Sequence, residues 1–67
     1  MPSTHLTQRE HQVLRYIVNG ATSREVATQL NLSVQTVEAH RFNLMKKLNV
    51  KNMAQLITRA LKTSLML

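Results

Sequence analysis

Six side chains carry the groups most often used in catalysis or metal binding: His5, His11, His40, Glu10, Glu25 and Glu38. No two of the histidines have a metal-ligand spacing on one expected helix, and a single histidine beside an apolar helix face is more often structural than catalytic. The chain also has no cysteine, which excludes disulfides and thiolate metal sites. The sequence therefore predicts no enzyme, no metal site and no cofactor.

Residues 34–48 offer a different chemistry, because they are expected to form one helix with two unlike faces. At about 100° per residue, one narrow arc holds Val37, Leu44 and Leu48, with Val34 and Met45 at its edge. The opposite arc holds Gln35, Glu38, Ala39, Phe42 and Lys46. We expect the first arc to face the core and the second to face a partner.

The outer arc carries groups that can read base edges in the major groove of DNA. Gln35 can pair with an adenine edge, and Glu38 can accept a hydrogen bond from cytosine N4. Ala39 and Phe42 can touch a thymine methyl group, while Lys46 is better placed for a phosphate. An outward Phe is costly without a partner surface, so the alternative is that Phe42 folds back onto a neighbouring helix.

All of the excess positive charge lies in the second half of the chain. Nine Lys and Arg against three Glu give a net charge of +6 and a pI near 11.0. Residues 1–38 are balanced, whereas residues 39–67 hold every excess cation and no acid. Clustered bases with a pI above about 9 are typical of nucleic-acid binders. The alternative is a solvated basic face that serves solubility.

The elements that position these residues are expected to be helices, since the chain has one Gly and one Pro. Two capping boxes, Thr7-Gln8-Arg9-Glu10 and Thr22-Ser23-Arg24-Glu25, mark the starts of the first two helices. The first helix is expected over 7–19, where Gly20 can adopt the left-handed conformation that ends a helix. The second helix, 23–30, is short.

Ser33 is the expected N-cap of the third helix, 34–48, and a fourth helix follows at 52–65. Two helices joined by three or four residues, the second about four turns long, have the shape of a helix-turn-helix. The predicted fold class is therefore all-α, a single four-helix helix-turn-helix domain over residues 1–67.

The starts of the second, third and fourth helices carry hydroxyls, amides or cations. Free backbone N–H groups and the positive end of a helix dipole bind phosphate oxygens. The residues at these starts are Thr22, Ser23, Arg24, Ser33, Val34, Gln35, Thr36, Lys51 and Asn52. Ordinary capping is the alternative, because these residues cap helices in any case.

The fourth helix has an apolar arc that is too wide for one face. The residues expected to pack on the domain are Met53, Leu56, Ile57 and Ala60, and those left uncovered are Ala54, Leu61 and Leu65. An apolar stripe without an internal partner suggests a homodimer contact. The alternatives are that both stripes face a small irregular core, or that the C-terminal tail frays.

A pattern spread over residues 6 to about 61 resembles a known family. Its members are Leu6-Thr7-Gln8-Arg9-Glu10, Val13-Leu14, Gly20, Glu25-Val26-Ala27, Leu30, Leu32-Ser33, Thr36-Val37, His40, Asn43-Leu44 and Lys47-Leu48. With this spacing the chain resembles the LuxR/FixJ-type (NarL-like, GerE-like) helix-turn-helix domain of bacterial transcription regulators.

The resemblance implies that the third helix recognises DNA and the fourth forms the dimer. It implies base contacts at Glu38, Ala39 and Phe42, to which the helical wheel adds Gln35. The implied phosphate contacts are Thr22, Arg24, Ser33, Thr36, Lys47, Lys51 and Asn52, and we add the third-helix cations Arg41 and Lys46. Two positions depart from the family pattern, since position 38 is often Lys or Arg and position 42 is often polar or basic.

The partners implied by the resemblance are double-stranded DNA, a second copy of the chain and RNA polymerase. We expect a cytoplasmic, nucleoid-associated regulator without a membrane segment. The chain has no Asp, which excludes a receiver-type phosphoacceptor within it. It is either a domain of a longer regulator or a stand-alone module.

A second interpretation keeps the fold and changes the partner. Glu38 and Phe42 on the outer arc would suit a protein-interaction module that binds another protein through the third or fourth helix.

Overall fold

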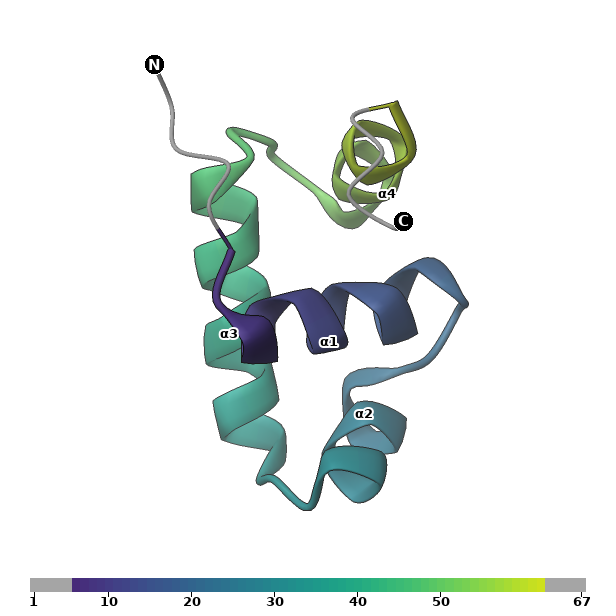
Figure 1. The fold of residues 1–67 in the computed structure, drawn as a ribbon, viewed down its shortest axis with the longest axis vertical. Helices are drawn as coiled ribbons and strands as arrows, with labels where there is room; N and C mark the ends of the chain where they lie inside the picture. Colours follow the sequence, from purple (N-terminus) through teal and green to yellow (C-terminus); the bar gives the residue numbers. More distant parts are fainter. Residues whose placement is uncertain (1–5, 63–67) are drawn as a thin grey trace.

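The computed structural model describes residues 6–62, which form four helices joined by short turns (Figure 1). They are α1 (Gln8–Val18), α2 (Ser23–Leu30), α3 (Val34–Lys47) and α4 (Met53–Lys62). The predicted all-α helix-turn-helix class is confirmed. The predicted helices differ from the observed ones mainly because they include the residues that cap the ends. The predicted end of the fourth helix, at position 65, lies outside the described residues.

The first two helices begin with the capping boxes that the sequence predicts. Thr7 Oγ1 accepts the Glu10 N–H at 3.1 Å, and the Glu10 carboxylate accepts the Thr7 N–H at 2.9 Å. Thr22 and Glu25 repeat this exchange at 3.1 and 2.8 Å. Each box satisfies two backbone donors that have no partner within the helix, so local sequence alone defines both helix starts.

The other two helices begin with a single polar cap. Ser33 Oγ accepts the Thr36 N–H at 3.0 Å at the start of α3. At the start of α4, Asn52 Oδ1 accepts the Gln55 N–H at 2.9 Å, and Gln55 Oε1 accepts the Lys51 N–H at 2.8 Å. The predicted starts near Ser33 and Asn52 are therefore confirmed.

Each of the three turns contains a residue with positive φ. Gly20 has φ +90° after α1, as the sequence predicts, because glycine has no Cβ to oppose this conformation. Asn31 and Asn49 adopt φ values of 56° and 55° after α2 and α3. Asparagine tolerates the left-handed region better than most residues, since its short side chain bonds locally. These turns let the chain change direction between one helix and the next within a few residues.

The core lies where α1 and α3 cross, because each of these two helices contacts all three others (Figure 1). Its buried apolar residues are Val13, Leu14, Ile17, Val26, Ala27, Val37, Leu44, Leu48, Leu56 and Ala60. Leu32, in the turn between α2 and α3, packs against this cluster. Burial of these side chains is the main force that holds α3 against the rest of the domain.

The longest helix, α3, has the two faces that the wheel predicts. Val37, Leu44 and Leu48 at its C-cap are at most 1% exposed, which confirms the core face. Met45 is half-buried at the edge of that face. Val34 differs from expectation with 42% exposure, because it begins the helix and points away from the centre of the buried arc. The helix is therefore fixed along one side only.

Candidate nucleic-acid interface

The exposed side of α3, which we call the outer face, consists of Gln35, Glu38, Ala39, Phe42 and Lys46. All five are exposed, and α1 and α2 pack on the other side of the helix. The structure thus brings the sequence-predicted base-contact residues together on one continuous surface.

Phe42 points outward and does not fold back onto a neighbouring helix. It is 63% exposed, and the Lys46 Nζ lies 5.6 Å from the centre of its ring. This distance allows a cation–π contact, which at an exposed site contributes about 0.5–1 kcal/mol. The alternative left open by the sequence is therefore wrong, and an apolar ring stands next to a cation on the outer face.

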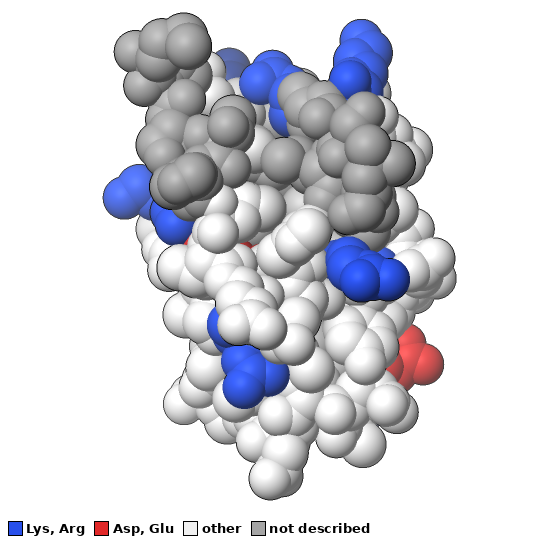
Figure 2. Space-filling view, in the orientation of Figure 1, with Lys and Arg blue, Asp and Glu red and all other residues white. Residues whose placement is uncertain are grey.

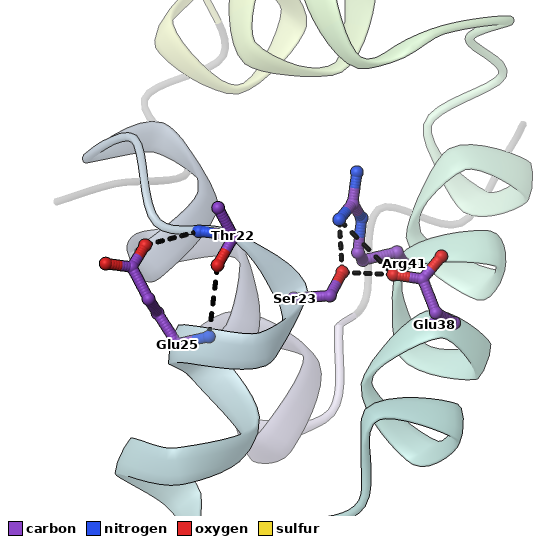
Figure 3. A network of polar contacts seen from close by, with 5 residues as sticks. All are labelled: Thr22, Ser23, Glu25, Glu38 and Arg41. Carbon is purple, nitrogen blue, oxygen red and sulfur yellow. Dashed lines mark hydrogen bonds and ion pairs between the residues drawn. The ribbon is translucent and has the colours of Figure 1, made fainter.

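Glu38 lies in a polar network between α2 and α3 (Figure 3). Ser23 Oγ donates to Glu38 Oε2, and Arg41 Nη1 donates to Ser23 Oγ. Arg41 Nη1 is also 3.3 Å from Glu38 Oε2. The carboxylate on the outer face thus has a cation beside it and a hydroxyl from the neighbouring helix.

The sequence named Ser23 only among the residues at a helix start, because the capping box gives the N-cap role to its neighbour Thr22. Nothing local shows that the first turn of α2 faces the middle of α3. The only sequence signal is a hydroxyl next to a cap, and that signal is common. Arg41 was predicted as a phosphate contact, and the structure places its guanidinium in the network with Glu38.

The residues predicted at helix starts are accessible, and several of them also cap. The exposed members are Thr22, Arg24, Ser33, Thr36, Lys51 and Asn52. The hydroxyls of Ser33 and Thr36 share a hydrogen bond of 2.9 Å in addition to the cap. Capping and exposure therefore coexist at three helix N-termini, where backbone N–H groups and the helix dipole favour anions.

Lys47, a predicted phosphate contact, lies on the flank of α3, between the outer face and the buried face. Its Nζ donates to Glu10 Oε1 at 2.6 Å, and the Lys47 side chain is 32% exposed. Glu10 is 4% exposed, and its Oε1 also accepts the Thr7 N–H. The pair connects the start of α1 with the end of α3.

The pKa of Glu10 results from opposing effects. Burial alone would raise the pKa of the Glu10 carboxyl, but hydrogen bonds from Lys47 and Thr7 and the charge of Lys47 outweigh it. The pKa therefore lies below its ordinary value, and the carboxylate is charged at neutral pH. The sequence predicted a capping role for Glu10 and not its pairing with Lys47. Its spacing from Val13, Leu14 and Ile17 was the signal that it lies on the buried side of α1.

On α4, the residues predicted to pack on the domain are buried or half-buried, and the described residues predicted for a dimer contact are exposed. Leu56 and Ala60 are buried, and Met53 and Ile57 are half-buried against the core. Two of the three residues predicted for a dimer contact, Ala54 and Leu61, are exposed, Leu61 to 59%. The third, Leu65, lies outside the described residues.

Positive charge is spread over the surface, and acidic surface is scarce. Figure 2 shows blue Lys and Arg side chains at intervals over one face, with red confined to small areas. Two of the three glutamates, Glu10 and Glu38, each have a cation within 4 Å. The surface that remains is therefore attractive to a polyanion.

Among the described residues, the histidines and glutamates form no group of metal ligands. His11 and His40 are half-buried on different helices, and His5 lies outside the described residues. Within residues 6–62, no three His, Cys, Asp or Glu side chains are grouped as metal ligands. Over the same residues, no helix has the length and apolar character needed to cross a membrane.

Comparison with known proteins agrees with this geometry. The family model described as bacterial regulatory proteins, luxR family, matches residues 4–60. The chain is 49% identical over 57 residues to the uncharacterized response regulatory protein YgeK of Escherichia coli, covering 85% of this chain and 39% of that protein. It is 42% identical over 65 residues to the oxygen regulatory protein NreC of Staphylococcus carnosus, covering 97% of this chain and 30% of that protein.

A third relative, the response regulator protein TmoT of Ectopseudomonas mendocina, is 40% identical over 62 residues, covering 90% of this chain and 28% of that protein. The chain thus spans roughly a third of the length of the curated relatives it matches. The matched segment contains all of α1, α2 and α3, including the outer face. This chain belongs to the luxR family of bacterial regulatory proteins, a family of DNA-binding transcription regulators and not of enzymes.

Proposed function

We propose that this domain binds double-stranded DNA in a sequence-specific manner, as the DNA-binding part of a transcription regulator, with α3 in the major groove. The observation that carries the proposal is the division of α3 into a buried face and an exposed outer face. A major groove about 12 Å wide admits one helix. The outer face supplies both polar and apolar groups along the part of α3 that would lie in it.

The base contacts would come from the outer face. Gln35 would pair with adenine, and Glu38 would accept from the N4 amino group of cytosine. Ala39 and Phe42 would contact thymine methyl groups, with Ala39 allowing the helix backbone to approach the bases. A good bidentate pair, such as that of Gln35 with adenine, would discriminate against a wrong base by about 1–3 kcal/mol.

The phosphate contacts would come from the helix starts and from cations beside the groove. Their side chains are Thr22, Arg24, Ser33, Thr36, Arg41, Lys46, Lys47, Lys51 and Asn52. Such contacts position the domain on the duplex and carry no sequence information. Lys47 differs from the others in this set, because its ammonium also holds Glu10. Its loss would act on stability as well as on binding.

Dimerisation through α4 would place two copies of α3 on an inverted repeat. Ala54 and Leu61 are exposed and seven residues apart, so they lie on one stripe of the helix. Leu65, the third residue predicted for this contact, lies outside the described residues. In a cytoplasmic regulator that contains this domain, RNA polymerase would be the further partner.

The proposal is tested by selecting bound duplexes from a random library at near-physiological salt. We expect enrichment of an inverted repeat whose half-sites are about 10 base pairs apart. Affinity should fall with salt at a slope near −0.9 per neutralised phosphate. No enrichment, even at low salt, would contradict sequence-specific binding.

A second candidate function, a protein-interaction module, is favoured by two exposed apolar side chains. Phe42 and Leu61 are 63% and 59% exposed, on α3 and α4 respectively. A contact centred on these residues would bury apolar surface and would change little with salt. The salt dependence of binding to the partner, DNA or protein, therefore separates the two functions.

A further inference from the structure

Ser23 connects the outer face of α3 with α2. It is half-buried in the first turn of α2, where the N-cap function belongs to Thr22. Its hydroxyl is therefore not needed for capping, and it donates to Glu38 and accepts from Arg41 instead (Figure 3). The two α3 residues are one turn apart, and Ser23 bridges them from the neighbouring helix.

The contacts divide the Glu38 carboxylate into two unlike oxygens. Ser23 and Arg41 both bind Oε2. Within residues 6–62, no hydrogen bond or ion pair falls on Oε1. The Glu38 side chain is 56% exposed, so the second oxygen remains open to an incoming donor. A carboxylate held in this way has one occupied acceptor and one available acceptor in a fixed direction.

We propose that Ser23 is a positioning residue for base recognition, which holds Glu38 so that its Oε1 accepts a hydrogen bond from a base amino group. Cytosine N4 is the major-groove donor that a carboxylate pairs with. The proposal rests on the proposed function, since it assumes that the outer face enters the groove. It adds a residue of α2 to the determinants of sequence preference, although Ser23 itself need not touch a base.

The network also explains how a carboxylate can lie in a surface that approaches a polyanion. Arg41 Nη1, at 3.3 Å, offsets the charge of Glu38, and the Ser23 hydroxyl keeps the two side chains together. Without the hydroxyl, the pair joins the exposed Glu38 to the half-buried Arg41 three residues further along one helix, a contact that is weak and adopts several rotamers. The removal of Ser23 would therefore release Glu38 without removing it.

The test compares Ser23→Ala with Thr28→Ala, each in the full chain. Thr28 is a matched control, because its hydroxyl also lies on α2 but bonds to the backbone oxygen of Arg24 at 3.1 Å. Base preference at each position is measured by competition with singly substituted duplexes derived from the selected site. Thermal unfolding of both variants verifies that they are folded.

We expect Ser23→Ala to reduce discrimination for cytosine by roughly threefold to tenfold at the single base pair that Glu38→Ala also affects. Thr28→Ala and Ser23→Thr should retain the wild-type preference. In the Glu38→Ala background, Ser23→Ala should cause no further change at that base pair, because coupled residues are not additive.

Two results would overturn the proposal while the proposed function stands. One is a Ser23→Ala variant with unchanged preference at every position. The other is a uniform loss of affinity for all duplexes with a smaller salt slope, which would make Ser23 a phosphate contact. A wild-type domain that selects no sequence would overturn the proposed function and this proposal together.

Discussion

Two carboxylates tie α3 to a neighbouring helix, and they do so in opposite environments. Glu10 of α1 is 4% exposed and pairs with Lys47 at the C-terminal end of α3. Glu38 has a 56% exposed side chain and lies with Arg41 and Ser23 in the middle of the helix. Both pairs contain a half-buried cation, Arg41 at 23% and Lys47 at 32% exposure, so the two pairs differ in the burial of the carboxylate.

The difference indicates which role each pair can have. A buried charge without its partner is strongly destabilising, so the Glu10–Lys47 pair is needed to hold the helices together. A pair whose carboxylate stays in water contributes little to folding, which leaves Glu38 open to other contacts. We therefore expect the Glu10–Lys47 pair to serve stability and Glu38 to serve the proposed base contact, according to the access of each carboxylate to water.

The largest expected effect is that of Lys47→Ala on stability. We expect the free energy of unfolding to fall by about 2–3 kcal/mol, because the substitution leaves the Glu10 charge buried and unpaired. The Tm should fall by roughly 10 °C or more. Thermal and denaturant unfolding followed by circular dichroism would measure both.

Lys62→Ala is the matched control, since Lys62 is exposed on α4. It should change stability by less than about 0.5 kcal/mol. The double variant with Glu10→Gln and Lys47→Ala should regain part of the loss, because no charge is then left buried. If Lys47→Ala is as stable as the wild type, the contrast between the two pairs fails.

Lowering the pH should remove part of the stabilisation that the Glu10–Lys47 pair contributes. The pKa of Glu10 lies below its ordinary value of 4.5, so the folded state holds this proton less tightly than the unfolded state. The stabilisation is fully present above the ordinary value and is lost as the pH falls through the lowered one. Denaturant unfolding between neutral pH and pH about 3 should show this decline. Glu10→Gln should flatten it, and an identical slope in both proteins would contradict the assignment.

Arg41→Ala should affect stability less than Lys47→Ala. It removes a half-buried cation whose acid partner, Glu38, stays in water, so the free energy of unfolding should change by less than about 1 kcal/mol. The comparison with Lys47→Ala in the same unfolding assay separates the two pairs directly. A loss as large as that of Lys47→Ala would show that the Glu38 network is structural and not a recognition element.

Much of the fold could be predicted because it depends on local signals. The Thr7 and Thr22 capping boxes, the Ser33 cap and the positive φ at Gly20 each involve residues only a few positions apart. The periodicity of apolar residues predicted the buried face of α3. For the candidate site, the wheel also identified all five exposed residues of the outer face, while their contacts with DNA remain predictions.

The amino-acid sequence by itself determined where the helices begin, which faces they bury and that the chain resembles a family of DNA-binding regulators. Only the tertiary structure decided that Lys47 pairs with Glu10, that Phe42 stays exposed and that Ser23 reaches Glu38. The physical reason is distance along the chain. Caps and helical periodicity act over one turn, whereas Glu10 and Lys47 lie 37 residues apart and Ser23 and Glu38 lie 15 apart. Such partners are chosen by how the helices pack against one another.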